Sequence, residues 1–313
     1  SYANCGLPYY VGGVIKEQEE LTLQTPESFW DRFRIDVRVR QEVTAINPAE
    51  KTVTVRALDS GKIYTETYDK LLLAPGAKPT VPALSGVSSE RVFTLRTVED
   101  TLRIRHFVED QKPKNAVLAG GGFIGLEMAE NLTEMGVSVT IVQRPNQLLA
   151  PLDADMASFV HAEMRRHGVT LRLGETVTGF RQDGDSVLTL LESSEPLHSD
   201  MVLLAIGVTP DTHLAKDVGL ELGIRGSIAV TERMETSVPD IYAVGDAVEV
   251  THFVTGQKAL ISLAGPANKQ GRIAADNICG GNSRFTGSQG SSVLKLFSLT
   301  AASTGTVSYT HLR

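Results

Sequence analysis

The chain of 313 residues has little cysteine, a single tryptophan and no long apolar run. Its two cysteines, Cys5 and Cys279, lie far apart and have no metal-ligating neighbours at suitable spacing, which excludes a disulfide framework and a zinc site. No stretch approaches the roughly 18 apolar residues that span a bilayer, and no basic segment followed by an apolar one opens the chain. We therefore expect a cytoplasmic protein without a membrane partner.

Positive charge is also scarce. The formal net charge is −7 and no basic run stands out, whereas proteins that bind DNA or RNA cluster lysine and arginine against the phosphates. We expect no nucleic-acid partner. With 42% hydrophobic residues the chain can bury a sizeable core, and its length favours two domains.

The first part of the chain reads as an α/β unit with an antiparallel insertion. The segment TPESFWDRF starts with a cap, a proline and an acid, which predicts a short helix. Alternation from Val43, a turn at Asn47 and the segment TVTVRAL predict a β-hairpin. The apolar run in YDKLLLAPGAKP, stopped by proline and glycine, predicts a buried strand.

The middle of the chain has the pattern of a nucleotide-binding fold. The segment NAVLAGGGFIGLEMAENLTEMGVSVTIVQ predicts a strand, a glycine turn, a helix and a strand. A helix in DADMASFVHAEMRRHG, a hairpin turn at QDGDS and a strand in MVLLAIG follow. IYAVGDA then predicts a further strand, GPANKQGRIAADNICGG a helix, and SVLKLFSLTAAS strand structure. The predicted class is α/β.

Gly120, Gly122 and Gly125 form G-x-G-x-x-G between a predicted strand and a predicted helix, and they enclose Phe123 and Ile124. Glycines here permit a tight turn and close approach of a pyrophosphate, which the N–H groups of the helix terminus can bind. This context favours a dinucleotide site over a purely structural turn.

Residues at the next strand end and in the helix bear on the cofactor. An acid at the strand end would bind the ribose of NAD, but the chain has Gln143 followed by Arg144, so NADPH is plausible and NADH is not excluded. Arg144 can alternatively be a solvated loop charge. Glu127, placed in the first turn of the helix, either contacts the nicotinamide end of the cofactor or interacts only with the helix dipole.

Two further side chains have both a chemical and a structural interpretation. Asp246 follows Gly245 at a predicted strand end, where it can accept a hydrogen bond from a sugar-alcohol hydroxyl or simply form a turn. Cys5 is either a buried inert thiol or a nucleophile whose thiolate is stabilised by its surroundings. We interpret Cys279 as an inert thiol.

Taken in order, several segments resemble the pyridine nucleotide-disulfide oxidoreductase superfamily of flavoproteins with two dinucleotide-binding domains. These segments are SYANCGLPYYVGG, LLLAPGAKP, TLRTVED, AGGGFIGLEMAENL, LLAIGVTPDT, IYAVGDA and LAGPANKQGRIAADNI. A single cysteine in S-x-x-N-C-x-x-P-Y is similar to coenzyme A disulfide reductases, including the rhodanese-fused kind that reduce persulfides and polysulfides. Tyr10 stands five residues after Cys5, where the dithiol members have a second cysteine.

The resemblance implies a path of electron transfer. NAD(P)H bound at Gly120 to Gly125 would reduce FAD, and FAD would pass electrons to Cys5, which attacks a disulfide or persulfide of the coenzyme A type. The residues implied to contact FAD or to shape the pocket around the sulfur are Asn4, Pro8, Val43, Ala74, Pro75, Gly76, Arg96, Gly207, Gly245, Asp246 and Ala264.

The resemblance also implies a domain arrangement. Residues 1–98 and 231–288 would form an FAD-binding domain, residues 99–230 an inserted NAD(P)-binding domain, and residues 289–313 the start of a dimerisation domain. Both nucleotide domains would be Rossmann-like. Because the family's N-terminal FAD fingerprint is absent and TVSYTHLR does not resemble the family's continuation, we expect a fragment of a homodimeric parent that is itself inactive.

Three other functions remain open at this point. A NADH oxidase or peroxidase would cycle Cys5 through a sulfenic acid. A flavin electron-transfer reductase would pass electrons to a partner protein and leave Cys5 inert. The fragment by itself could also be a nucleotide-binding module without activity.

Overall fold

A computed structural model describes residues 2–307, so the end of the segment TVSYTHLR lies outside the described residues. The α-helices are α1 (Leu7–Val11), α2 (Pro26–Phe33), α3 (Val98–Gln111), α4 (Phe123–Glu134), α5 (Ala154–Arg166), α6 (His213–Asp217) and α7 (Ala264–Ile278). The short 3-10 helices are η1 (Asn4–Gly6), η2 (Gln18–Leu21), η3 (Ile224–Gly226) and η4 (Gly245–Ala247). The helix predicted from TPESFWDRF is confirmed as α2, whose N-cap Thr25 accepts a hydrogen bond from the Ser28 N–H.

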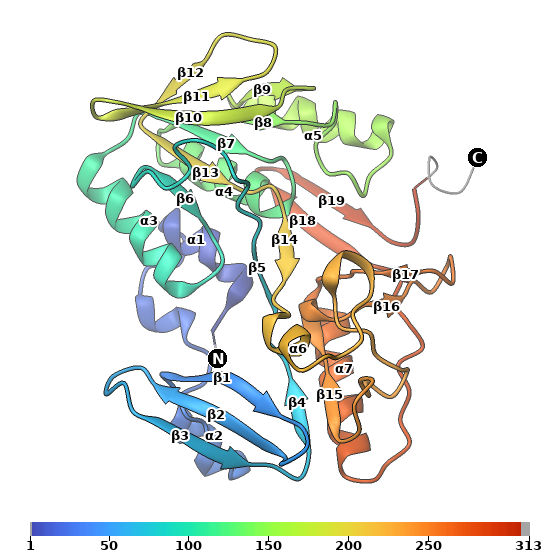
Figure 1. Cartoon of the computed structure of the whole chain (residues 1–313). Coiled ribbons are helices and arrows are strands. Elements are labelled where there is room, and N and C mark those ends of the chain that lie inside the picture. Colours follow the sequence, from blue (N-terminus) through green and yellow to red (C-terminus); the bar gives the residue numbers. More distant parts are fainter. Residues whose placement is uncertain (1, 308–313) are drawn as a thin grey trace.

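A five-stranded parallel sheet forms the upper half of the molecule in Figure 1. Its strands, in spatial order, are β6 (Val92–Thr94), β13 (Met201–Leu204), β7 (Asn115–Ala119), β8 (Ser138–Gln143) and β9 (Thr170–Leu173). The predicted strand–helix–strand unit is confirmed, because β7 and β8 pair in parallel and α4 connects them. Strand β6, which pairs with β13, comes from the part of the chain before residue 99, where the predicted NAD(P)-binding domain begins. The division of the chain into domains stays a prediction.

Smaller sheets surround the parallel one. Antiparallel meanders are made by β1 (Gln41–Asn47), β2 (Thr52–Ala57) and β3 (Ile63–Thr67), and by β10 (Val177–Asp183), β11 (Ser186–Leu191) and β12 (Leu197–Ser199). The pairs are β4 (Leu71–Leu73) with β15 (Ile241–Ala243), β5 (Ala77–Pro79) with β14 (Val208–Pro210), β16 (Val250–Thr251) with β17 (Lys258–Ala259), and β18 (Ser292–Leu296) with β19 (Leu299–Ser303). The predicted hairpin thus gains β3, which continues the alternation of the first two strands.

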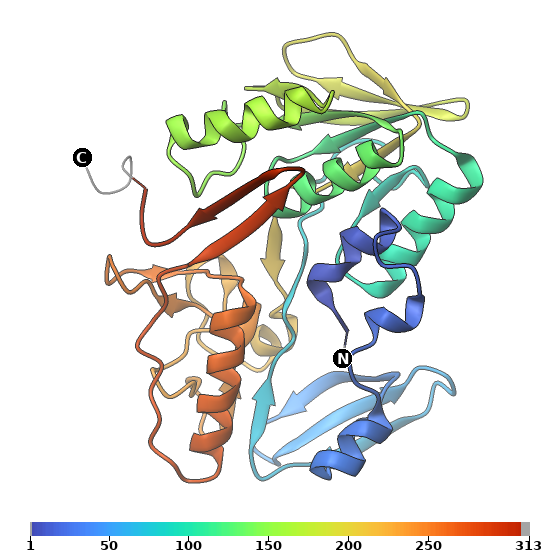
Figure 2. The same cartoon turned by 180° about the vertical axis from the view of Figure 1, so that it is seen from behind.

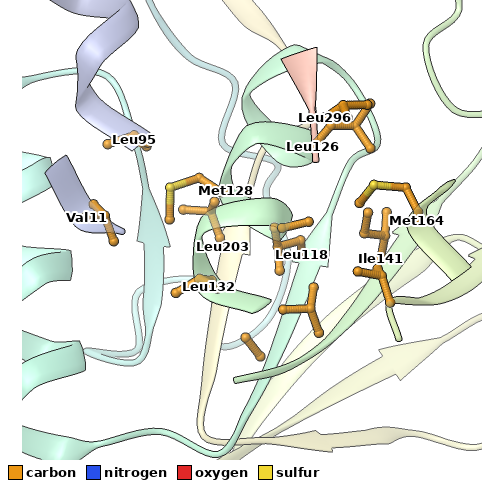
Figure 3. Close-up of a cluster of buried hydrophobic side chains, with 14 of the residues drawn as sticks. Val11, Leu95, Leu118, Leu126, Met128, Leu132, Ile141, Met164, Leu203 and Leu296 are labelled. Carbon is orange, nitrogen blue, oxygen red and sulfur yellow. The ribbon is translucent and has the colours of Figure 1, made fainter. Parts of the chain in front are cut away.

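Apolar side chains gather in separate clusters that correspond to the two halves of the molecule. The larger cluster joins the parallel sheet to α1, α4, α5 and the β18–β19 hairpin, and Figure 3 shows Val11, Met128, Ile141 and Leu296 among its members. A second cluster lies around β4, β15 and α7. Since α1 packs in the larger cluster, the segment that carries Cys5 is fixed to the half that contains the glycine turn.

Two carboxylates attach the β18–β19 hairpin to the half of the molecule that contains the parallel sheet. Glu130 of α4 accepts a hydrogen bond from the N–H of Phe297 at 2.8 Å, and Glu163 of α5 accepts one from the N–H of Ser298 at 3.0 Å. The Phe297 ring stacks on His167 with 3.8 Å between centroids. Figure 2 shows the hairpin running beside α4 and α5 above the α7 unit. These contacts hold both turn residues of the hairpin.

An ionic cluster ties the β1–β3 meander to β15. Asp240, the residue before β15, accepts hydrogen bonds from Lys51 in the β1–β2 turn and from Lys70 before β4. These two ammonium groups lower the pKa of the Asp240 carboxyl to about 2. The cluster joins segments that are far apart in the chain.

The pairing of Asp240 predicts a defined pH dependence. Because its folded pKa lies below the unfolded value of 3.8, its stabilisation is present above that value and is lost as the pH falls toward 2. We expect Asp240→Asn to lower the urea midpoint at pH 7, and the difference from the unmodified chain to disappear near pH 2. The control is Asp69→Asn at a neighbouring exposed position. A difference that does not change with pH would contradict the ionic origin.

Candidate active site

The three motif glycines have different spatial requirements. A Cβ on Gly120 would lie 2.3 Å from the carbonyl oxygen of Ala205, and one on Gly125 would lie 2.1 Å from the carbonyl oxygen of Gly120. These two positions allow the close packing of turn, helix and strand. Gly122, the N-cap of α4, has no atom within 4 Å of a Cβ built there. The open space is therefore at Gly122, at the helix terminus where a pyrophosphate is expected to bind.

The strand-end residues lie beside this turn. The Gln143 side-chain carbonyl accepts a hydrogen bond from the N–H of Gly121 at 2.9 Å, and its amide group donates to the Gln147 carbonyl oxygen at 3.2 Å. Arg144 is exposed. Phe123 and Ile124 form the first turn of α4 and are partly buried. The structure thus brings the predicted dinucleotide residues together.

Cys5 lies in η1, directly before α1, and its side chain is exposed. The interpretation of Cys5 as a buried thiol is therefore wrong. Asn4 is exposed beside it, whereas Pro8 is buried in the first turn of α1. Cys279, the C-cap residue of α7, is also exposed, so its inertness cannot rest on burial either.

The helix that follows Cys5 is held from two sides. Arg105 of α3 donates to the carbonyl oxygens of Tyr10 and Val11, each at 3.0 Å. These carbonyls lie at the C-terminal end of α1, where backbone acceptors have no helical partner. On the other side, a Cβ on Gly12 would lie 2.0 Å from Oδ1 of Asn131 in α4, so only glycine permits this approach.

Glu127 lies on the same helix as the glycine turn and has an unusual pKa. Burial, and after it the charge of Glu130, raise the pKa of the Glu127 carboxyl to about 7. The prediction that Glu127 lies in the first turn is wrong, because α4 begins at Phe123 and has no acid in its first turn. Because the effect of the helix dipole falls off within the first turn, the position of Glu127 does not support a role in helix capping.

Tyr9 connects Glu127 electrostatically with Cys5. Burial raises the pKa of the Tyr9 phenol, and the charges of Glu127, Glu130 and Cys5 raise it further. Tyr9 lies in α1, and Cys5 lies four residues before it in the preceding 3-10 helix η1. The Tyr9 phenol is therefore within electrostatic reach of both the Cys5 thiol and the Glu127 carboxyl.

A second group of predicted residues meets at the end of β15. Arg96, between β6 and α3, forms an ion pair with Asp246 at 3.1 Å and donates from Nε to the carbonyl oxygen of Ala77 at 2.9 Å. A Cβ on Gly76 would lie 3.3 Å from this guanidinium. The N–H of Gly245 donates to the side chain of buried Gln270 in α7 at 2.7 Å. The structure joins segments of both halves here.

Some predicted contacts line a separate apolar cavity of about 250 Å³. Val43, Ala74 and Pro75 are among its lining residues, together with hydrophobic residues of β2, β4 and α6. Gly207, exposed, precedes β14, and Ala264, also exposed, begins α7. The assignment of all these residues to cofactor contacts stays a prediction.

The sequence reasoning missed residues that hold the site. Arg105, Asn131 and Gln270 act through contacts between distant segments, for which the chain carries no local signal. Tyr9 could have been found, because it is the last residue of the S-x-x-N-C-x-x-P-Y pattern around Cys5.

The different roles of the glycines predict separable effects. We expect Gly125→Ala to destabilise the chain by roughly 2 kcal/mol, because its Cβ meets the backbone. Gly122→Ala should leave the free energy of unfolding within about 0.5 kcal/mol and weaken binding of NADH and NADPH at least about tenfold. Urea unfolding and calorimetry measure these effects. Equal destabilisation in both variants would contradict the assignment.

The raised pKa of Glu127 predicts a loss of stability with rising pH. Its contribution is fully present below the unfolded value of 4.5 and is lost as the pH rises through about 7, a change of up to about 3 kcal/mol. We expect Glu127→Gln to be more stable than the unmodified chain at pH 8 but not at pH 4.5. The control is Glu134→Gln, at an exposed position of the same helix. Parallel pH profiles for Glu127→Gln and the unmodified chain would refute a buried carboxyl.

Within residues 2–307, no helix has the length and apolar character needed to cross a bilayer, and no cluster of three or more histidine, cysteine or acidic side chains is placed to hold a metal ion.

Curated relatives match almost the whole chain. The NAD(P)H sulfur oxidoreductase (CoA-dependent) of Pyrococcus abyssi is 36% identical over 97% of the chain and 67% of the relative. The coenzyme A disulfide reductase of Staphylococcus aureus is 34% identical over 97% of the chain and 68% of the relative. The NADH oxidase of Methanocaldococcus jannaschii is 35% identical over 99% of the chain and 68% of the relative.

A solved structure has the same fold. Reduced CoADR-RHD of Bacillus anthracis superposes with a TM-score of 0.94 and is 48% identical over 98% of this chain. The match covers 55% of that longer chain. The profile of the pyridine nucleotide-disulphide oxidoreductases matches residues 1–271. With its glycine turn, its parallel sheet and an exposed cysteine beside them, the chain belongs to the pyridine nucleotide-disulphide oxidoreductase family.

Proposed function

We propose that the protein is an FAD-dependent NAD(P)H oxidoreductase that reduces coenzyme A disulfide, or a persulfide or polysulfide of coenzyme A, through Cys5. The observation that carries this proposal is the exposed Cys5 thiol on a segment fastened to the glycine-turn half of the molecule. The names of the relatives from Pyrococcus abyssi and Staphylococcus aureus support the same substrate class.

The residues of this chain fit the two cofactors. The N-terminus of α4 and the open space at Gly122 suit the pyrophosphate of NAD(P)H. Asp246 and Arg96 supply an acceptor and a donor that can bind the ribityl or pyrophosphate region of FAD. FAD, when bound, supplies the chemistry that carries two electrons from the coenzyme to sulfur.

Cys5 is the proposed nucleophile. Its thiolate attacks one sulfur of the acceptor, a bond forms between that sulfur and Cys5, and the S–S bond of the acceptor breaks to release a thiolate. Two electrons then cleave the mixed disulfide and restore the Cys5 thiolate, while the second thiol leaves. Tyr9, which lies within electrostatic reach of Cys5 and Glu127, can influence where protons reside during this exchange.

The finer assignments belong to the same proposal. We place the protein in the cytoplasm as a homodimer, and we place the boundaries of its nucleotide domains at residues 98, 230 and 288. The residues predicted to contact FAD or the substrate sulfur keep those roles as proposals.

Oxidase activity is the second candidate. The relative from Methanocaldococcus jannaschii is named NADH oxidase and is about as similar in sequence as the reductases are. In that reaction Cys5 would alternate between thiol and sulfenic acid with oxygen or peroxide as acceptor. Steady-state rates of the full-length protein with NADH and NADPH, measured against coenzyme A disulfide, polysulfide and oxygen, separate the two candidates.

Substitution of the nucleophile tests the thiol chemistry. In the full-length protein we expect Cys5→Ser to lower kcat with coenzyme A disulfide at least about a thousandfold, because a serine hydroxyl is not ionised near neutral pH and cannot form the mixed disulfide. Reduction of the bound flavin by NAD(P)H, followed by absorbance, should persist.

Cys279→Ser is the matched control and should retain activity, since Cys279 caps α7 at the far end of the chain. Unchanged turnover of Cys5→Ser with every disulfide acceptor would rule out thiol chemistry and favour an electron-transfer reductase. Fast turnover with oxygen alone would favour the oxidase.

A further inference from the structure

The end of β8 has an uncharged side chain where a dinucleotide site can carry an acid. Acids at this position bind the 2′-hydroxyl of NADH, and they repel the 2′-phosphate of NADPH by their charge. Gln143 occupies the position and is the last residue of β8. A glutamine at this position, in place of a carboxylate, removes the charge repulsion of the 2′-phosphate and keeps a polar side chain there.

Gln143 is also committed to contacts within the protein. Its carbonyl oxygen accepts the N–H of Gly121 at 2.9 Å, and its amide donates to the Gln147 carbonyl at 3.2 Å. One side chain thus ties the glycine turn to the loop after β8. Because both polar ends of the Gln143 side chain are bonded within the protein, it has little hydrogen-bonding capacity left for a ribose. Neighbouring side chains therefore have to recognise the adenosine half of the coenzyme.

Arg144 is the neighbouring cation. It is exposed at the first position after β8, and Pro145 and Asn146, which follow it, are exposed as well. An arginine at a strand end binds a phosphate through two parallel N–H groups, with more geometric specificity than a lysine.

The acidic side chain near this loop, that of Glu175, bonds to a residue outside the loop. Glu175 follows β9, and its backbone N–H donates to the carbonyl oxygen of Gln143 at 3.2 Å. Its carboxylate accepts a hydrogen bond from the hydroxyl of Ser194. Glu175 therefore approaches the end of β8 with its backbone, while its charge is directed to the segment after β11.

We propose that this dinucleotide site selects NADPH, with Arg144 binding the 2′-phosphate beside an uncharged, internally bonded Gln143. The inference rests on the proposed function for the use of a nicotinamide coenzyme, and it names which coenzyme that is. Arg144 is the specificity residue, and Gln143 is a positioning residue that keeps the glycine turn and the loop in register.

Binding of nucleotide fragments to the 313-residue chain tests the proposal without flavin, acceptor or turnover. Calorimetry at fixed ionic strength compares 2′,5′-ADP (adenosine 2′,5′-bisphosphate) with 5′-AMP, which lacks only the 2′-phosphate. We expect 2′,5′-ADP to bind at least about tenfold more tightly, the effect of a charge-assisted hydrogen-bonded pair. Arg144→Gln should remove this preference and leave 5′-AMP affinity within about twofold.

Two further variants separate charge from structure. Gln143→Glu places a carboxylate of nearly the same shape at this position and should reverse the preference toward 5′-AMP. Arg181→Gln removes another exposed arginine, on β10, and should leave both affinities unchanged. Thermal unfolding of each variant verifies that the chain remains folded.

The outcomes distinguish this inference from the function on which it rests. Equal affinity for the two nucleotides, or a preference that survives Arg144→Gln, overturns the selection of NADPH and leaves the dinucleotide site intact. Binding of neither nucleotide overturns both. A preference for 2′,5′-ADP that Arg144→Gln removes and Arg181→Gln preserves supports the inference, even if no reductase activity is found in the full-length protein.

Discussion

The contact between Gly12 and Asn131 is the constraint on which the geometry of the site depends. The space between α1 and α4 is so small that a single Cβ on Gly12 would overlap the Asn131 side chain. Asn131 is in turn held by its hydrogen bond to the carbonyl oxygen of Glu127. Because α1 follows Cys5 and α4 begins at the glycine turn, this packing fixes the thiol relative to the coenzyme site.

Helix α4 also places two carboxyl groups in different surroundings. Burial raises the pKa of both, but Glu130 accepts a hydrogen bond from the N–H of Phe297, which partly offsets the cost of its charge. Among the described residues, no hydrogen bond to the Glu127 carboxyl offsets its burial, and its pKa is raised to about 7. One acid therefore attaches the hairpin, whereas the other can hold or release a proton near Tyr9.

The half of the molecule around β4 and β15 is joined to the rest by individual polar contacts. Arg96 reaches across to Asp246, whereas Gln270 binds the N–H of Gly245 within that half and holds the end of β15 in place. These contacts fall at the ends of strands, where ligands of open α/β sheets bind. The polar groups that join the two halves are thus the same groups that we propose for the flavin.

The sequence by itself determined the α/β class, the strand–glycine turn–helix–strand unit and helix α2, because caps, glycines and apolar periodicity are local signals. It also indicated Cys5 through its resemblance to a family, although periodicity alone left that thiol undecided. Only the tertiary structure decided that Cys5 is exposed, that partial burial raises the pKa of Glu127, and that Gln143 is bonded at both ends. Exposure and pKa depend on which distant segments pack around a side chain, and no spacing within the chain specifies those neighbours.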